Sequence, residues 1–325
     1  MALVEIDNVN ELKPGEVLLK MEYVGFCGSD LSTFLGKNPM VKMPVIPGHE
    51  VGATIVEVGS EVPEGLKPGM TVTLNPYTNC NKCASCRNGR PNACKDNQTL
   101  GVQRDGAMRE YLVMPWEKVI PAGLLTPRTC ALVEPMSVGF HAVSRAQVTD
   151  IDVVLVIGCG MVGMGAIVRS VLRGATVVAA DIDDEKLALA REVGASYTIN
   201  SKTEDVHARL LEMTGGFGPD VVIEAVGSAP TYQMAVDEVA FSGRVSASVM
   251  PRPTCRSRRN SSCRRNSISV DRAMQCLPTS VPSSTISSVA HAQWISLSVW
   301  SARLRKLPRR WRSGLRHRGR CLGCW

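Results

Sequence analysis

The chain has 325 residues, and its 37 Lys and Arg against 30 Asp and Glu give a formal net charge of +7. This length is sufficient for two domains with separate cores, and no apolar run approaches the ~18 residues that a membrane span needs. The N-terminal sequence has no basic flank and no apolar core of a secretory signal, so we expect a cytoplasmic protein.

The charge is distributed unevenly along the chain. Residues 1–245 contain 21 Lys and Arg against 29 Asp and Glu, a balance of −8. Residues 246–325 contain 16 basic residues and one acid, Asp271, a balance of +15. Such different compositions predict different structures for the two parts.

Short β-branched runs predict a β-rich module at the N-terminus. The predicted strands are Val17–Val24, Ala53–Val58 and Met70–Leu74. Pro-Gly pairs at residues 14–15, 47–48 and 68–69 lie between these runs and are typical of turns.

From about Asp152 the pattern changes to apolar runs that alternate with helical periods. The predicted strands are Val153–Ile157, Thr176–Ala180 and Val221–Glu224, and the predicted helices are Gly163–Leu172, Glu185–Val193 and Tyr232–Val239. Strands separated by helices predict a parallel, doubly wound sheet, so the fold class is α/β.

Four cysteines lie close together in a polar segment. They are Cys80, Cys83, Cys86 and Cys94. This spacing suits a tetrahedral zinc site with four thiolate ligands, which braces a loop and leaves no coordination position open for a substrate. Disulfides or free thiols are the alternatives, and the missing secretory signal disfavours disulfides.

A glycine-rich turn follows the first strand of the α/β part. Gly158, Gly160 and Gly163 have the spacing G-x-G-x-x-G, directly after an apolar strand and at the start of a predicted helix. Glycines at these positions allow a tight turn, a close backbone approach to a pyrophosphate and close packing of helix on strand. Val162, within the same turn, is also a candidate cofactor-binding residue.

An acidic residue ends the next predicted strand. Asp181 lies 23 residues after Gly158, where a carboxylate would accept hydrogen bonds from the adenosine ribose of a dinucleotide. Its charge would repel a 2′-phosphate, so we expect NAD rather than NADP. Lys186, five residues later, would weaken this preference. The alternative is a plain glycine turn followed by an aspartate that caps a helix.

Three further pieces of sequence carry potential metal ligands. They are Cys27-Gly28-Ser29-Asp30, Gly48-His49-Glu50 and Glu134-Pro135. Each piece alone is typical of ordinary core or surface residues. Together they supply sulfur, nitrogen and oxygen donors, which is what a catalytic zinc needs when three protein ligands leave one position open for an alkoxide.

These motifs, in this order, resemble those of the zinc-dependent medium-chain alcohol and polyol dehydrogenases over about residues 1–245. The resemblance implies a GroES-like, β-rich catalytic domain in residues 1–125 and a Rossmann NAD-binding domain in residues 126–245. It also implies two zinc ions per chain and NAD as the cofactor. The family suggests a homodimer or a homotetramer.

The resemblance also implies roles for individual residues. Cys27 and His49 would be ligands of the catalytic zinc, and Glu50 a direct or alternating ligand that belongs to the catalytic site. Glu134 lies where ethanol-type enzymes place a cysteine ligand. Ser29 matches the hydroxyl that passes the substrate proton toward solvent. The four clustered cysteines match the structural zinc lobe.

The implied reaction is the oxidation of an alcohol by hydride transfer to the nicotinamide ring, with zinc lowering the pKa of the substrate hydroxyl. A carboxylate at Glu134 is typical of the sorbitol, glucose and threonine dehydrogenase branch. Ser32 stands where threonine dehydrogenases usually have a histidine, so a polyol or sugar acid is the preferred substrate and threonine the alternative.

Residues 246–325 have a composition unlike that of the family. They are rich in Arg, Ser and Pro without a strand or helix period, as in disordered segments. Codons can be chosen that encode this segment in one reading frame. Read in a shifted frame, the same codons encode short sequences that resemble the family, such as Ile-Gly-Tyr-Ala-Lys-Ala. We therefore predict a frameshift, with a genuine basic tail as the alternative.

A frameshifted tail, not homologous to the family, would leave the Rossmann half incomplete and remove the strand that pairs subunits. We expect this chain to fold poorly and to be nearly inactive.

The basic tail also supports a hypothesis from another class of protein. A charge of +15 would bind phosphate backbones nonspecifically and with a steep salt dependence. The tail has no Phe or Tyr for stacking and no recognisable nucleic-acid fold. We therefore expect a small-molecule substrate, no specific nucleic acid and no membrane partner.

Overall fold

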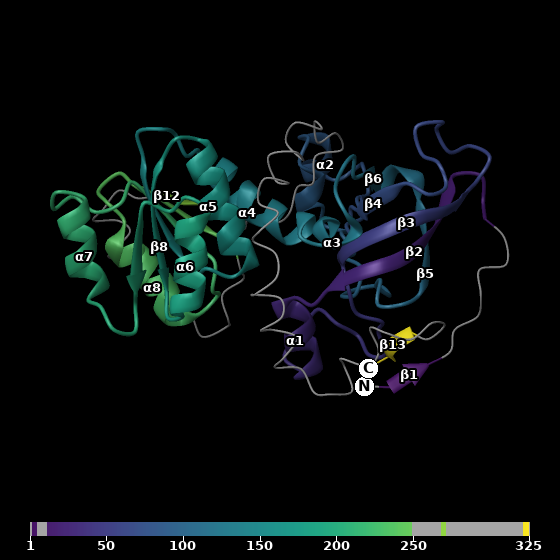
Figure 1. Cartoon of the computed structure of the whole chain (residues 1–325), viewed down its shortest axis with the longest axis horizontal. Coiled ribbons are helices and arrows are strands. Elements are labelled where there is room, and N and C mark those ends of the chain that lie inside the picture. The colour runs from purple at the N-terminus through teal and green to yellow at the C-terminus, as the bar shows by residue number, and fades with distance from the viewer. Residues whose placement is uncertain (1, 5–11, 249–267, 271–320, 325) are drawn as a thin grey trace. The chain divides into compact units, whose positions relative to one another are not determined.

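The computed structural model describes residues 2–4, 12–248, 268–270 and 321–324. The chain divides into two compact units, with the division between Glu134 and Pro135 (Figure 1). No helix in the described ranges has the length and apolar character of a membrane span.

The first unit contains a five-stranded antiparallel sheet in the order β5-β2-β3-β4-β6. Its strands are β2 (Glu16–Gly25), β3 (Glu50–Val58), β4 (Thr71–Leu74), β5 (Tyr111–Pro115) and β6 (Val119–Pro121). Val17 and Leu19 on β2 are fully buried and alternate with more exposed neighbours, as expected for a strand with one face on the core. The three predicted N-terminal strands are confirmed, whereas β5 and β6 were not predicted.

Short helices complete the first unit. They are α1 (Gly28–Phe34), α2 (Ala84–Arg87) and α3 (Pro127–Cys130), with 3-10 turns at Pro91–Ala93 and Trp116–Lys118. A separate two-stranded antiparallel sheet pairs β1 (Ala2–Val4) with β13 (Cys321–Cys324).

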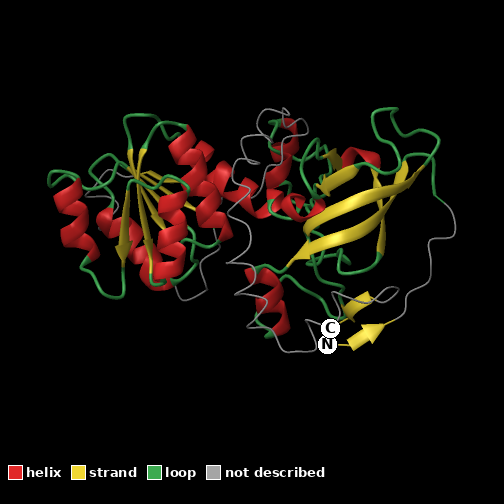
Figure 2. Ribbon diagram, viewed as in Figure 1, coloured by secondary structure: helices red, strands yellow, loops and turns green. Residues whose placement is uncertain are grey.

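The second unit is built on a six-stranded parallel sheet in the order β12-β11-β10-β7-β8-β9. Figure 2 shows strands of this sheet with helices packed beside them. Its strands are β7 (Val153–Ile157), β8 (Thr176–Asp181), β9 (Tyr197–Asn200), β10 (Val221–Glu224), β11 (Arg244–Ala247) and β12 (Ile268–Val270). From β7 the chain winds one way to β8 and β9 and then the other way to β10, β11 and β12. This is the doubly wound order of a dinucleotide-binding sheet.

Helices connect these strands, as the alternating pattern predicted. They are α4 (Val133–Arg145), which leads into the sheet, α5 (Met161–Leu172), α6 (Asp184–Glu192), α7 (Val206–Met213) and α8 (Ala229–Glu238). The three predicted helices correspond to α5, α6 and α8 and are confirmed with small shifts at their ends. The sequence did not predict α7 or β9.

Two strands of this sheet extend into the segment for which the sequence predicted no regular structure. Ser246 and Ala247 belong to β11, and Ile268–Val270 forms β12, which pairs in parallel with β11. The expectation that the sheet would stop near residue 245 is therefore corrected. The three residues of β12 form a strand because the edge of β11 supplies backbone groups with which they pair. Apart from residues 246–248, 268–270 and 321–324, the tail for which we predicted disorder lies outside the described ranges.

Two glycines bring α4 and α5 into close contact. A Cβ on Gly139 would lie 2.2 Å from the carbonyl oxygen of Val162, and a Cβ on Gly165 would lie 2.5 Å from that of Met136. Backbone atoms cannot move aside as a flexible side chain can, so only glycine fits at either position. The contact fixes α5, which starts at the glycine-rich turn.

We expect Gly139→Ala to destabilise the second unit by about 1–3 kcal/mol, because the added methyl group overlaps backbone atoms of α5. Urea unfolding would measure the difference. Ser144→Ala, on an exposed part of the same helix, is the matched control and should leave stability nearly unchanged. Equal unfolding midpoints for wild type and Gly139→Ala would contradict the close helix contact.

Candidate metal centres and dinucleotide-binding turn

The pairing of β2 with β3 brings three predicted ligands together. Gly25 at the end of β2 lies opposite Glu50 at the start of β3, so Cys27 lies next to His49 although 21 residues separate them in the chain. One ligand atom from each of Cys27, His49 and Glu50 lies within 4.8 Å of the other two. The antiparallel register thus forms a cluster of sulfur, nitrogen and oxygen donors.

Gly48 places His49 in this cluster. Its φ of +103° lies in the left-handed region that favours glycine. A Cβ at this position would lie 2.8 Å from Cγ1 of Val24 and 2.9 Å from Cγ of Met108. Both the backbone conformation and the available space therefore require glycine immediately before the histidine.

Cys27 caps the N-terminus of α1. Its Sγ accepts the backbone N–H of Ser29 at 3.1 Å, and its own N–H donates to Oδ2 of Asp30 at 2.9 Å. The hydroxyl oxygen of Ser29 lies 3.0 Å from Cys27 Sγ. The predicted proton-passing hydroxyl therefore lies beside a predicted metal ligand.

The cluster carries a surplus of negative groups. His49 is 4% exposed, and its Nδ1 has no hydrogen-bond partner within the described ranges. Burial opposes the charged imidazole, but Cys27, Asp30 and Glu134 outweigh it and raise the pKa of His49 well above its usual value. Burial also raises the pKa of Asp30. A buried site with excess negative charge and mixed S, N and O donors fits a divalent zinc ion.

Glu134 lies near this cluster but outside the group of converging ligand atoms. It is 2% exposed in the first turn of α4, and its Oε1 accepts the hydroxyl of Tyr77. Burial raises the pKa of Glu134, and burial together with the negative Glu134 raises that of Tyr77 well above its usual value. Tyr77 therefore orients a carboxylate that interacts electrostatically with His49.

A threonine ties the chain leading to Glu134 to the sheet. The hydroxyl of Thr73 on β4 makes hydrogen bonds with the carbonyl oxygens of Val51, at 2.8 Å, and Cys130, at 3.3 Å. These contacts hold α3 against β3 and β4, and α4 follows α3 after two residues.

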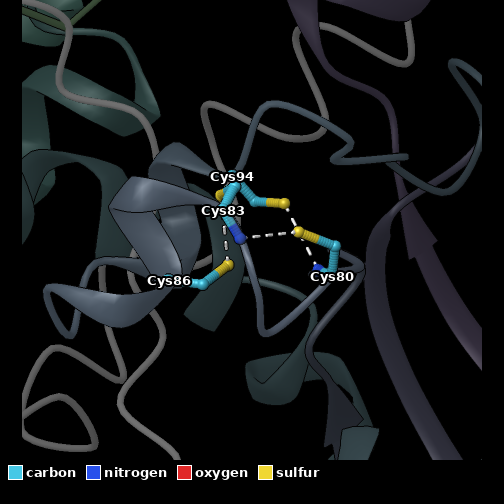
Figure 3. A group of neighbouring side chains, drawn as sticks. All are labelled: Cys80, Cys83, Cys86 and Cys94. Carbon is cyan, nitrogen blue, oxygen red and sulfur yellow. Dashed lines mark hydrogen bonds between the residues drawn. The ribbon is translucent and has the colours of Figure 1, made fainter.

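The four clustered cysteines converge as their spacing predicted (Figure 3). One sulfur from each of Cys80, Cys83, Cys86 and Cys94 lies within 4.8 Å of the others. The backbone N–H of Cys80 donates to Cys94 Sγ and that of Cys83 donates to Cys80 Sγ, both at 3.3 Å. None of the seven cysteines within residues 12–248 forms a disulfide.

Two thiols of this second cluster have pKa values shifted in opposite directions. Backbone hydrogen bonds from Cys86 and Lys95 lower the pKa of Cys83 to about 6. Burial and side-chain hydrogen bonds with Cys83, Cys94 and Cys80 raise the pKa of Cys86 to about 12. The donor set and its convergence fit a closed, tetrahedral zinc site.

The glycine-rich turn lies between β7 and α5. Gly158 has a φ of +94°, and a Cβ on Gly163 would lie 1.7 Å from the carbonyl oxygen of Gly158. Gly160 is the N-cap of α5 and has no side chain to satisfy the first N–H groups of the helix. Val162 lies in the first turn. The turn is thus a backbone cradle at a helix N-terminus, which fits a pyrophosphate.

Asp181 lies at the end of β8 beside this cradle. Its Oδ2 accepts the N–H of Cys159 at 2.7 Å, and its Oδ1 accepts that of Ile182 at 2.8 Å. Lys186 Nζ lies 3.6 Å from Asp181 Oδ1 and 3.6 Å from Asp183 Oδ2. The carboxylate is therefore oriented by the glycine-rich turn itself.

Sequence reasoning gave no role to Asp30, Tyr77 or Glu224, which the structure places at these sites. Asp30 was visible in the Cys27 motif, and its helix-capping position was the available signal. Tyr77 follows β4 and Glu224 ends β10, and nothing in the local sequence indicates which groups they contact.

Comparison with known proteins places both units in described families. Residues 13–124 match the alcohol dehydrogenase GroES-like domain, and residues 162–270 match the zinc-binding dehydrogenase domain. The second match extends beyond residue 245, where the composition changes. Similarity to the family therefore reaches β12.

Individual relatives cover most of the chain. It is 34% identical over 233 residues to L-galactonate-5-dehydrogenase of Escherichia coli, covering 71% of this chain and 67% of the relative. It is 34% identical over 241 residues to sorbitol dehydrogenase of Halalkalibacterium halodurans, covering 72% and 69%. The crystal structure of galactitol-1-phosphate dehydrogenase from Escherichia coli superimposes with a TM-score of 0.78 at 28% identity, covering 88% of this chain and 84% of that chain.

Proposed function

The chain belongs to the zinc-dependent medium-chain alcohol dehydrogenase family, and from this premise we propose that it oxidises a secondary alcohol of a polyol or sugar acid to a ketone with NAD. The family is one of zinc- and NAD(P)-dependent alcohol oxidoreductases. The relatives named for L-galactonate and sorbitol support the finer choice of substrate class. The observation that carries the proposal is the convergence of Cys27, His49 and Glu50.

In this proposal Cys27, His49 and Glu134 would hold the catalytic zinc, with Glu50 as a direct or alternating ligand, so that one position stays open for the substrate. When bound, zinc polarises the substrate hydroxyl and lowers its pKa. Ser29, whose hydroxyl lies beside Cys27 Sγ, would accept the substrate proton and pass it toward solvent.

The remaining residues position these groups. The carboxylate of Asp30 accepts the backbone N–H of Cys27, and the hydroxyl of Tyr77 donates to Glu134. Gly158, Gly160, Val162 and Gly163 would contact the pyrophosphate of NAD. Cys80, Cys83, Cys86 and Cys94 would hold the structural zinc.

The test of function is a substrate panel assayed with NAD and zinc. The panel contains polyols, sugar acids, ethanol and threonine, and the readout is NADH formation by the 325-residue chain and by the chain with its frame restored after residue 245. We expect polyol or sugar-acid oxidation in the frame-restored chain and a far lower rate in the 325-residue chain. A zinc-loaded, frame-restored chain that oxidises threonine best, or nothing in the panel, would contradict the proposed substrate class.

The panel also tests the effect of the tail and the rival class of function. Rapid polyol oxidation by the 325-residue chain would refute its expected inactivity. Salt-sensitive retention on DNA, with no NADH formation by either chain, would favour nonspecific nucleic-acid binding.

We propose that Asp181 sets the preference for NAD. Asp181→Ser should weaken NADH binding about tenfold and improve NADPH binding, because the carboxylate that bonds a ribose and repels a 2′-phosphate is lost. Asp183→Ser is the matched control, since Asp183 also pairs with Lys186 but caps α6 rather than ending β8. Fluorescence titration measures the dissociation constants of NADH and NADPH. An unchanged ratio of the two constants in Asp181→Ser would refute this role.

A further inference from the structure

A buried carboxylate lies at the point where the sheet reverses its winding. Glu224 ends β10 and is 0% exposed. In the parallel register of β10 and β7 it lies opposite Ile157, the residue before Gly158. Doubly wound sheets bind ligands beyond the carboxyl ends of the strands at the position where the strand order reverses. Here that position is between β7 and β10.

One oxygen of this carboxylate holds the turn that follows β10. Glu224 Oε1 accepts the N–H groups of Val226 at 2.9 Å and Gly227 at 2.8 Å. It also accepts the hydroxyl of Thr231 at 2.8 Å, in the first turn of α8. Hydrogen bonds to a charged acceptor are stronger than those to a neutral one. The carboxylate thus joins the turn 225–228 to the helix after it.

The same turn packs directly on the glycine-rich turn. The N–H of Ala225 donates to the carbonyl oxygen of Ile157 at 2.9 Å. A Cβ on Gly158 would lie 2.5 Å from Cγ2 of Val226, and a Cβ on Gly163 would lie 3.6 Å from Cβ of Ala225. A shift of Ala225 or Val226 therefore changes the space around Gly158 itself.

The second oxygen of Glu224 destabilises the folded chain, so stability alone does not explain a carboxylate at this position. Oε2 is buried and has no hydrogen-bond partner within the described ranges. Burial raises the pKa of Glu224, against the hydrogen bonds from Gly227, Thr231 and Val226, which lower it. An unsatisfied buried oxygen destabilises a folded chain, so the hydrogen bonds of Oε1 to the turn are the benefit that the structure shows.

We propose that Glu224, supported by Thr231, is a positioning residue of the cofactor site, holding the turn 225–228 against the glycine-rich turn as the second wall of the dinucleotide-binding site. The inference rests on the proposed function, because it requires that a dinucleotide binds at Gly158–Gly163. It adds to that function a residue that does not itself touch the cofactor.

The test compares Thr231→Val and Glu224→Gln with a matched threonine variant in the same unit. Thr198→Val is the control, because the hydroxyl of Thr198 accepts one hydrogen bond, from Nε of Arg191 at 2.8 Å, on the outer strand β9. Each full-length variant is titrated with NADH by fluorescence, and its thermal unfolding is recorded. A role limited to stability would lower the melting temperature of both threonine variants and leave NADH binding intact in both.

We expect Thr231→Val to bind NADH about 5-fold more weakly, because it removes the hydroxyl that contacts both Glu224 and Ser228 beside the turn. Glu224→Gln should bind about 10-fold more weakly, because a neutral amide oxygen is a weaker acceptor than the carboxylate. Thr231→Ser should restore wild-type affinity, and Thr198→Val should retain it. Wild-type affinity in Thr231→Val would overturn the inference even where Glu224→Gln fails to fold. Absence of NADH binding by both the wild-type 325-residue chain and the frame-restored chain would overturn the proposed function and the inference with it.

Discussion

Replacing Cys80 by serine is expected to lower the zinc content from two ions per chain to one and to unfold the segment 80–94. Of its side chains only that of Cys94 is buried, and its regular structure is limited to α2 and one 3-10 turn. Without an apolar core, the segment depends on the metal for its order. Structural zinc contributes about 10–16 kcal/mol of binding free energy in zinc-finger peptides, so the loss of one ligand has a large effect.

Metal analysis and limited proteolysis measure this effect. Cleavage should become rapid between Cys80 and Cys94 in the variant and in the wild-type chain treated with a chelator. Cys130→Ala removes a buried cysteine outside both clusters and serves as the control, with both zinc ions retained. A Cys80→Ser chain with two zinc ions and unchanged cleavage would show that the cluster is not a structural metal site.

Replacing His49 by glutamine is expected to remove the other zinc ion and to lower polyol oxidation by about a thousandfold or more. Without the metal the substrate hydroxyl keeps a pKa far above neutral, and hydride transfer from the protonated alcohol is slow. Oxidation is measured on the frame-restored chain, and zinc content on the 325-residue chain as well. The cobalt-substituted protein adds a spectroscopic signature, because the absorption from the bond between Cys27 and cobalt should disappear.

The matched control for this variant is His207→Gln. His207 pairs with Glu238 between α7 and α8, with its side chain largely exposed. The control should retain both metal ions, and NADH binding should persist in both histidine variants. Full zinc content together with undiminished oxidation in His49→Gln would exclude His49 as a ligand.

Much of the second unit was predictable because its signals are local. The apolar runs of β7, β8 and β10 and the glycine spacing before α5 each lie within a few consecutive residues, and backbone preference and burial act in the same direction there. The prediction failed at β12, where a short strand forms against the edge of β11 in a sequence without a strand pattern of its own. The frameshift hypothesis for residues 246–325 stays a prediction that sequencing of the DNA would test.

The two metal clusters differ in how far the sequence determines them. The four cysteines lie within 15 residues, so their spacing alone restricts them to one loop and predicts a closed zinc site. Cys27, His49 and Glu50 come together only because β2 and β3 pair in one register. Their chemistry could be listed from the sequence, but their proximity could not be derived from it without the family resemblance.

By itself the sequence determined the family of folds, the donor chemistry of both metal sites and the position of the dinucleotide turn. These properties depend on the identity and spacing of neighbouring residues. Only the tertiary structure decided that Tyr77 orients Glu134, that Asp30 is buried near His49, and that Glu224 braces the turn beside Gly158. These roles arise from burial and from contacts that the local sequence does not reveal. Desolvation and hydrogen bonding depend on which groups folding brings together, so only the tertiary structure determines them.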